Sequence, residues 1–90
     1  MAKVIAIRLV RETDEENDDE IGISAVAEIE AAQTTQIIRS PGVWGIEANV
    51  DDEYADQVAE EEYEELVAIL EDLGIEKVPP FEKAEWSDEH

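Results

Sequence analysis

Carboxylates are the most numerous groups in this 90-residue chain that could take part in chemistry. Residues 51–72 contain eleven of them and residues 12–20 contain seven, and neither segment contains a lysine or an arginine. Paired carboxylates act as general acid and base when different surroundings separate their pKa values, and clustered carboxylates can hold Ca²⁺ or Mg²⁺. The first segment would place its acids in similar surroundings on one helix face. The second lacks the alternating acids and central glycine of a calcium loop. We therefore expect neither catalysis nor a specific metal site.

No other residues form a recognisable catalytic or cofactor-binding motif. The chain has no cysteine, and its one histidine is His90 at the end of the sequence. Ser24, Ser40 and Ser87 have no base at the spacing of a known nucleophile motif, and the four glycines form no phosphate-binding loop. The sequence therefore predicts a non-enzymatic protein without a cofactor.

The net charge of −20 indicates what kind of partner the protein would attract. A large negative field favours a basic protein partner and disfavours direct contact with nucleic acid or an anionic membrane surface. No apolar run approaches the roughly 18 residues that would cross a bilayer, and the first residues lack the pattern of a signal peptide. The hydrophobic fraction of 43% is enough for a folded domain. We expect a soluble, cytoplasmic protein of unknown oligomeric state.

The elements that position the carboxylates can be predicted from hydrophobic periodicity. Apolar residues alternate in residues 3–11 and again in residues 21–31, which is typical of strands with one face on a core. We expect these strands to pair antiparallel through an acidic loop at residues 12–20. Arg8 and Arg11 could then lie across from Glu28, Glu30 or the loop.

Two short strands and one helix follow. Residues 35–40 and 43–48 predict the strands, and the sequence from Ser40 to Val43 predicts a type II turn between them. Residues 51–73 predict a helix, because apolar residues recur at helical spacing at positions 55, 58, 59, 63, 66, 67, 70 and 73. Asn49 or Asp51 can cap its start, and Gly74 followed by Ile75 can end it.

The prediction is an α+β fold. It consists of a small antiparallel sheet of three to four strands with one C-terminal helix packed on one face. A single domain would occupy residues 1–75, followed by a polar C-terminal tail at residues 76–90.

Trp44 has two possible roles. Its alternation with Ile46 favours a core position under the helix. The alternative is an exposed aromatic anchor for a partner, because tryptophan is enriched at the energetic centres of interfaces.

The segment from Gly42 to Glu47, GVWGIE, resembles a family of small, mostly uncharacterised bacterial and phage-associated proteins. Members carry a Gly-Leu-Trp-Gly-Ile-Glu-type segment, then Ser/Asp residues and an acidic helix with a tyrosine, as Tyr54 is here. The resemblance covers residues 36–75 and departs at Val43 and at Ala48-Asn49. It implies a sheet followed by a helix and no established activity.

Two functions fit these observations. The first is a nucleic-acid mimic that inhibits a basic nuclease, repressor or CRISPR effector by occupying its basic cleft. The second is an interaction domain whose acidity is an adaptation to high salt, which the excess of 18 glutamates over 8 aspartates disfavours. The residues expected to contact a basic partner are exposed acids of the helix and the loop, namely Asp56, Glu60, Glu61, Glu64, Glu65, Asp18, Asp19 and Glu20.

Overall fold

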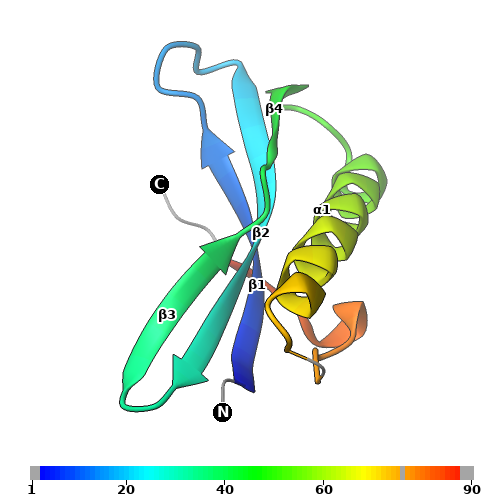
Figure 1. The fold of residues 1–90 in the computed structure, drawn as a ribbon. Helices are drawn as coiled ribbons and strands as arrows, with labels where there is room; N and C mark the ends of the chain where they lie inside the picture. Colours follow the sequence, from blue (N-terminus) through cyan, green and yellow to red (C-terminus); the bar gives the residue numbers. More distant parts are fainter. Residues whose placement is uncertain (1–2, 76, 88–90) are drawn as a thin grey trace.

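The computed structural model describes residues 3–75 and 77–87 of the chain. In chain order, the elements are β1 (Lys3–Thr13), β2 (Glu20–Ala31), β3 (Thr34–Arg39), β4 (Val43–Glu47), the helix α1 (Asp52–Asp72), the 3₁₀ helix η1 (Phe81–Lys83) and β5 (Glu85–Ser87). The five strands form one mostly antiparallel sheet, and α1 packs across one face of it (Figure 1). The predicted α+β class is confirmed.

β1 and β2 form the long antiparallel hairpin that the sequence predicts. Successive residues of a strand point to opposite faces, and the odd-numbered residues of β2 from Ile21 to Ile29 are buried against the helix. Both strands extend farther than predicted, so that the acidic loop between them is confined to residues 14–19. The loop closes through backbone hydrogen bonds from Asp14 to Glu20 and from Glu20 to Asn17.

The main core lies between the sheet and α1. Leu9, Ile23 and Ile29 of the sheet and Leu66 and Leu70 of the helix are almost fully buried there. Burial of an aliphatic side chain of this size contributes roughly 1.5–3 kcal/mol to folding. This packing offsets the repulsion among the helix carboxylates, because the helix contains no lysine or arginine that could do so.

β3 and β4 lie end to end along one edge of β2. β3 pairs with residues 26–31 of β2 and β4 pairs within residues 20–23, both antiparallel. The three residues between them, 40–42, bend the chain without reversing it, so the type II turn predicted from Ser40 to Val43 is not formed. Gly42 nevertheless has a φ of 86°, which glycine adopts without strain.

Both ends of α1 have the predicted caps. The Asp51 side chain accepts a hydrogen bond from the Tyr54 backbone N–H at 2.8 Å. At the other end, Gly74 has a φ of 85°, and the N–H of Ile75 returns to the Leu70 carbonyl at 2.9 Å, which is the Schellman arrangement. Leu73, predicted to belong to the apolar stripe, is instead 59% exposed, because the helix ends there.

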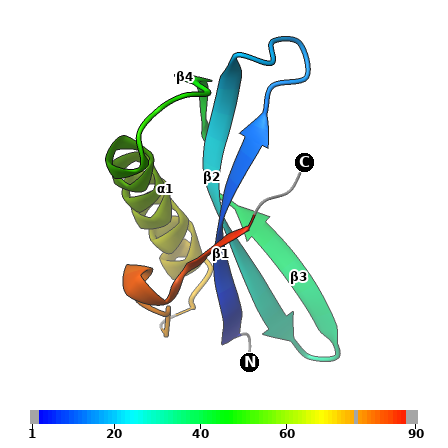
Figure 2. The ribbon, with the colours of Figure 1, turned by 180° about the vertical axis from the view of Figure 1, so that it is seen from behind.

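The helix is central in the chain, not C-terminal, which corrects that part of the prediction, and the sheet has five strands where three to four were expected. After α1 the chain returns along the sheet, and β5 pairs parallel with β1, with Trp86 opposite Leu9 (Figure 2). The Tyr63 hydroxyl donates to the Pro79 carbonyl, and its ring packs edge-on against Phe81 at a centroid distance of 5.6 Å. The described part of residues 76–90 is thus attached to the helix and the sheet.

Candidate interaction surface

The outward side of α1 carries nine exposed carboxylates, with none between Glu65 and Glu71. The helix buries Ala55, Val58, Ala59, Leu66 and Leu70 on the opposite side. The exposed acids, which we call the acidic helix face, are Asp52, Glu53, Asp56, Glu60, Glu61, Glu64, Glu65, Glu71 and Asp72. Because a helix rises about 1.5 Å per residue, this face presents one carboxylate for roughly every 3.5 Å of its length.

The five helix residues that the sequence predicts as contacts are all exposed, and they fall into three sets. Glu60 and Glu64 are one turn apart and point outward, away from the buried side. Glu61 and Glu65 form a second set one turn apart. Asp56 lies at the edge of the helix nearest β5, where it accepts a hydrogen bond from the Trp86 indole N–H at 3.3 Å.

The loop residues form a separate group. Asp18 and Asp19 are exposed, whereas Glu20 is half-buried where β2 begins. The backbone carbonyl of Asp19 accepts a hydrogen bond from Ala48 at 2.8 Å, which attaches the loop to the end of β4. The loop projects from the end of the hairpin, apart from the body of α1 (Figure 1). The structure therefore does not merge the two predicted acidic sets into one cluster.

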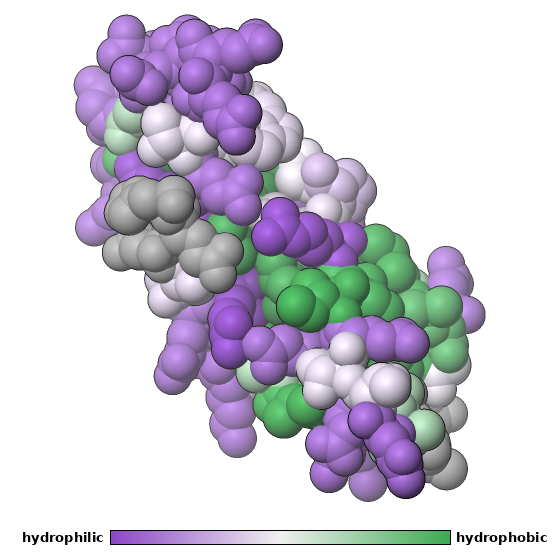
Figure 3. Space-filling model, turned by 90° about the vertical axis from the view of Figure 1, so that its left-hand side faces the viewer, coloured by the Kyte–Doolittle hydropathy of each residue, from purple (hydrophilic) through white to green (hydrophobic). Residues whose placement is uncertain are grey.

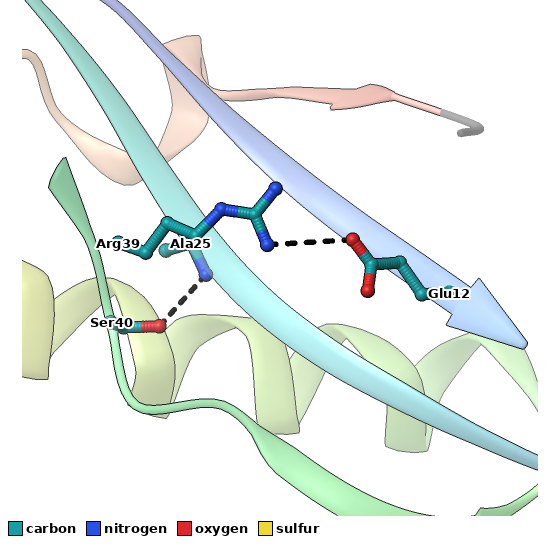
Figure 4. Close-up of polar contacts among 4 residues, drawn as sticks. All are labelled: Glu12, Ala25, Arg39 and Ser40. Carbon is teal, nitrogen blue, oxygen red and sulfur yellow. Dashed lines mark hydrogen bonds and ion pairs between the residues drawn. The ribbon is translucent and has the colours of Figure 1, made fainter. Parts of the chain in front are cut away.

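Two of the three arginines form ion pairs with acids of the sheet, and the third, Arg11, borders Asp52 and Asp56 of the acidic helix face without an ion pair to them. Arg8 pairs with Glu28 at 2.7 Å, as the sequence predicts, and Arg39 pairs with Glu12 at 3.5 Å (Figure 4). Arg11 donates to the Ala48 carbonyl at 2.8 Å. Within residues 3–75 and 77–87, no ion pair joins a basic side chain to the acidic helix face.

Glu62 is the carboxylate of α1 that the sequence reasoning missed, and it is buried beneath the acidic helix face. It is 3% exposed, and its Oε1 accepts hydrogen bonds from the Ser40 hydroxyl at 2.9 Å and from the Gly42 backbone N–H. The Ser40 oxygen in turn accepts the Ala25 backbone N–H at 2.9 Å (Figure 4). A buried carboxylate thus joins α1 to the bend between β3 and β4 and to β2.

The position of Glu62 in the sequence could have identified it. It lies three residues after Ala59 and four before Leu66, inside the apolar stripe. An acid at such a position must be paired, because an unpaired buried charge is costly.

Glu65 is the helix carboxyl whose titration the structure alters. A hydrogen bond with the Glu62 side chain raises the pKa of Glu65 above its usual range. The negative charge of Glu62, burial and the charge of Glu61 raise it further, in that order. Of the acidic helix face, Glu65 therefore takes up a proton more readily than an isolated glutamate.

Trp44 is exposed, which overturns its predicted core position. Its side chain is 54% exposed, whereas Ile46 is buried. The regular alternation fails because Gly45, between them, has a φ of 84°. The Trp44 ring lies instead on Gly22, whose odd-numbered neighbours Ile21 and Ile23 face the helix. Trp44 is therefore on the sheet face opposite α1.

The face opposite α1 is partly apolar. Val10 and Val26 are buried on it, and Ile37, which pairs with Glu28, is 63% exposed. Figure 3 views the molecule from this side and shows the acidic hairpin end in purple above a green apolar area.

No family model, curated protein or solved structure matches this chain. The resemblance inferred from Gly42 to Glu47 therefore remains a prediction. In the part of the chain that the structure describes, no group of three or more histidine or acidic side chains is arranged to hold a metal ion. No helix among these residues is long and apolar enough to cross a membrane.

Proposed function

We propose that this chain is a non-enzymatic binding protein whose acidic helix face occupies the basic cleft of a nucleic-acid-binding protein, such as a nuclease or a CRISPR effector. The observation that carries the proposal is the arrangement of charge on α1. Its exposed carboxylates have no basic neighbour on the helix, and Arg8 and Arg39 are paired with acids of the sheet. Arg11 borders Asp52 and Asp56 but donates its hydrogen bond to the Ala48 carbonyl. A cationic surface on a partner would neutralise the exposed carboxylates of α1.

The spacing of these carboxylates supports mimicry of a nucleic acid. A strand of a DNA duplex carries one phosphate for about 3.4 Å of axis. The acidic helix face carries one carboxylate for roughly every 3.5 Å of helix. A cleft that neutralises a row of phosphates would therefore meet a similar linear charge density on α1.

The helix holds this charge in a fixed arrangement. Leu66 and Leu70 anchor it to the sheet, Asp51 caps its start, and Glu62 ties its middle to the bend between β3 and β4. Fixing the backbone that carries the binding side chains before association lowers the entropic cost of binding. The loop residues Asp18, Asp19 and Glu20 provide a second acidic contact in this proposal.

Displacement of DNA tests the proposal. A panel of basic nucleases and CRISPR effectors, each bound to a fluorescent oligonucleotide, is titrated with the protein at low salt. We expect at least one member to release its oligonucleotide, with the effect weakening steeply as salt is added. The double variant Glu60→Lys/Glu64→Lys should lose this activity.

A matched control separates position from net charge. Glu30→Lys/Glu85→Lys changes the charge by the same amount at two exposed residues outside α1. We expect it to keep most of the displacement activity. Equal losses in both variants, or no displacement from any member of the panel, would refute the proposal.

Adaptation to high salt is the competing function, and one observation favours it. Like charges such as Glu60 and Glu64 are one turn apart on α1 without a neighbouring cation on the helix, so salt should stabilise the fold. A chain that folds only in molar potassium chloride and displaces nothing would support this second function. Full folding at low salt would count against it.

A further inference from the structure

The Trp44 side chain is exposed to solvent, yet its ring packs closely against the backbone of β2. A Cβ atom added to Gly22 would lie 2.5 Å from two carbon atoms of the indole, so the ring lies directly on the backbone of β2. Gly22 does not have a positive φ, and its missing side chain is therefore needed for the ring and not for the backbone. The indole is held flat on the sheet while 54% of the residue stays exposed.

Two more glycines determine the direction in which the Trp44 side chain points. Gly42 and Gly45 both have positive φ values, 86° and 84°, and they lie on either side of Trp44 in the chain. A side chain at either position would be strained. Gly42 also approaches the indole, since a Cβ there would lie 3.7 Å from the Trp44 Nε1. The local backbone thus turns Trp44 away from the core that its neighbour Ile46 enters.

Acidic side chains surround the exposed indole on two sides. Toward the hairpin end, Trp44 borders an open hollow of about 360 Å³ whose other lining residues are Glu12, Thr13, Asp14, Glu15 and Glu16. Toward α1 it borders a hollow of about 630 Å³ that also contains Glu47, Asp51 and Tyr54, the last of these 50% exposed. Trp44 therefore has acidic side chains on two sides, those at the hairpin end and those just before α1.

Arg39 is the cation nearest to this site, and it does not supply the missing positive charge. It lines a small hollow with Trp44, but its guanidinium pairs with Glu12 at 3.5 Å. Asp14, Glu15 and Glu16 form no ion pair among the described residues. The charge around the indole thus remains negative.

We propose that Trp44 is the anchoring site for an arginine side chain in an extended basic segment of the partner protein. A guanidinium stacks on an indole face, and carboxylates beside the ring attract and orient its charge. The segment would run from the hollow beside the loop, across Trp44, toward Glu47 and Asp51. This inference rests on the proposed function only in taking the partner to be basic.

A hexa-arginine peptide tests the anchor directly. Its affinity is measured at low ionic strength for the wild type, for Trp44→Leu and for Trp86→Leu. Trp86 is the other tryptophan of the chain and is 40% exposed, so both variants remove one exposed indole without altering net charge. We expect Trp44→Leu to weaken binding roughly 2- to 6-fold, Trp86→Leu to leave it unchanged, and Trp44→Tyr to retain most of it.

The wild-type protein provides a readout that does not depend on a variant folding. On titration with the peptide, the indole N–H resonance of Trp44 should shift in the NMR spectrum while that of Trp86 stays in place. Equal behaviour of the two indoles, or equal affinities of the two leucine variants, would show that Trp44 merely covers Gly22.

A second pair of variants tests the acids beside the ring. Glu15→Gln/Glu16→Gln should weaken peptide binding more than Glu71→Gln/Asp72→Gln, which removes the same charge at the far end of α1. Equal effects would indicate attraction by net charge alone and would overturn the anchor. The DNA-displacement panel is independent of this result. Its failure beside a Trp44-dependent peptide affinity would refute the proposed function and leave the anchor standing.

Discussion

The buried Glu62 carboxylate accepts a hydrogen bond from the Ser40 hydroxyl at 2.9 Å, across the junction between α1 and the sheet. The same oxygen accepts the backbone N–H of Gly42. A single acid therefore satisfies two donors in the bend that leads from β3 into β4. The direction in which β4 carries Trp44 depends on this bend.

Replacement of Glu62 should destabilise the fold. In Glu62→Ala, the buried Ser40 hydroxyl and the half-buried Gly42 N–H lose their acceptor, which costs roughly 1–3 kcal/mol. Glu62→Gln retains an acceptor oxygen and should lose less. Urea unfolding measures both values, and Glu61→Ala, at an exposed neighbour, is the control. A loss in Glu62→Ala no larger than in Glu61→Ala would show that these hydrogen bonds contribute little.

Gly22→Ala should destabilise the protein through Trp44. The added methyl group would lie 2.5 Å from the indole, so either the ring or the strand must move. We expect a loss of about 1–3 kcal/mol, as for other overpacked sites. In a Trp44→Ala background the same change should cost much less, because the ring is gone. A double-mutant cycle by urea unfolding measures this coupling, and additive losses would contradict the contact.

Reversal of two helix charges should stabilise the isolated protein at low salt. Glu60→Lys/Glu64→Lys places two cations among the remaining carboxylates and replaces repulsion by attraction, with each like-charge pair worth roughly 0.2–0.5 kcal/mol. The melting temperature should rise relative to the wild type, and the difference should shrink in molar potassium chloride. A difference that is independent of salt would mean that the change acts through helix propensity and not through charge.

Glu65 should make stability fall as the pH rises. Because the pKa of Glu65 is raised by its hydrogen bond with Glu62, the folded state binds a proton more tightly than the unfolded state does. Its contribution is therefore favourable below its folded pKa only, and it is lost as the pH rises from the ordinary glutamate range through that folded pKa. Glu65→Gln should flatten the dependence of melting temperature on pH. Glu64→Gln is the control, and an equal flattening there would contradict the assignment.

Much of the fold follows from short-range pattern. The alternation from Ile21 to Ile29 predicts β2 and its buried face, and the helical spacing up to Leu70 together with Gly74 predicts α1 and its end. These signals are reliable because one buried face dictates the period of each element. β5 gives no such signal, since three residues are too few to show a period and its partner, β1, is distant in sequence.

The errors at the candidate site concern Trp44 and Glu62. Trp44 was placed in the core by the phase of a regular strand, and Glu62 was not singled out. A positive φ at Gly45 reverses the phase at Trp44. Hydrogen bonds from outside the helix make burial acceptable for Glu62. The spacing of residues along the chain indicates that Glu62 is buried, but it reveals neither the hydrogen-bond partners of Glu62 nor the φ of Gly45.

The engagement of Arg8 and Arg39 in the sheet has a consequence for how the protein meets another molecule. Both guanidiniums lie on the face opposite α1, and the carboxylates of α1 face the other way. The two guanidiniums are offset by Glu28 and Glu12 on the same face, whereas the exposed carboxylates of α1 have no such partner, so the excess negative charge is greater on the α1 side. Near a positively charged body the molecule experiences a torque that turns α1 toward that body before contact. The two molecules therefore need less rotational diffusion to reach a productive orientation, and the sheet face is directed away from the partner during the approach.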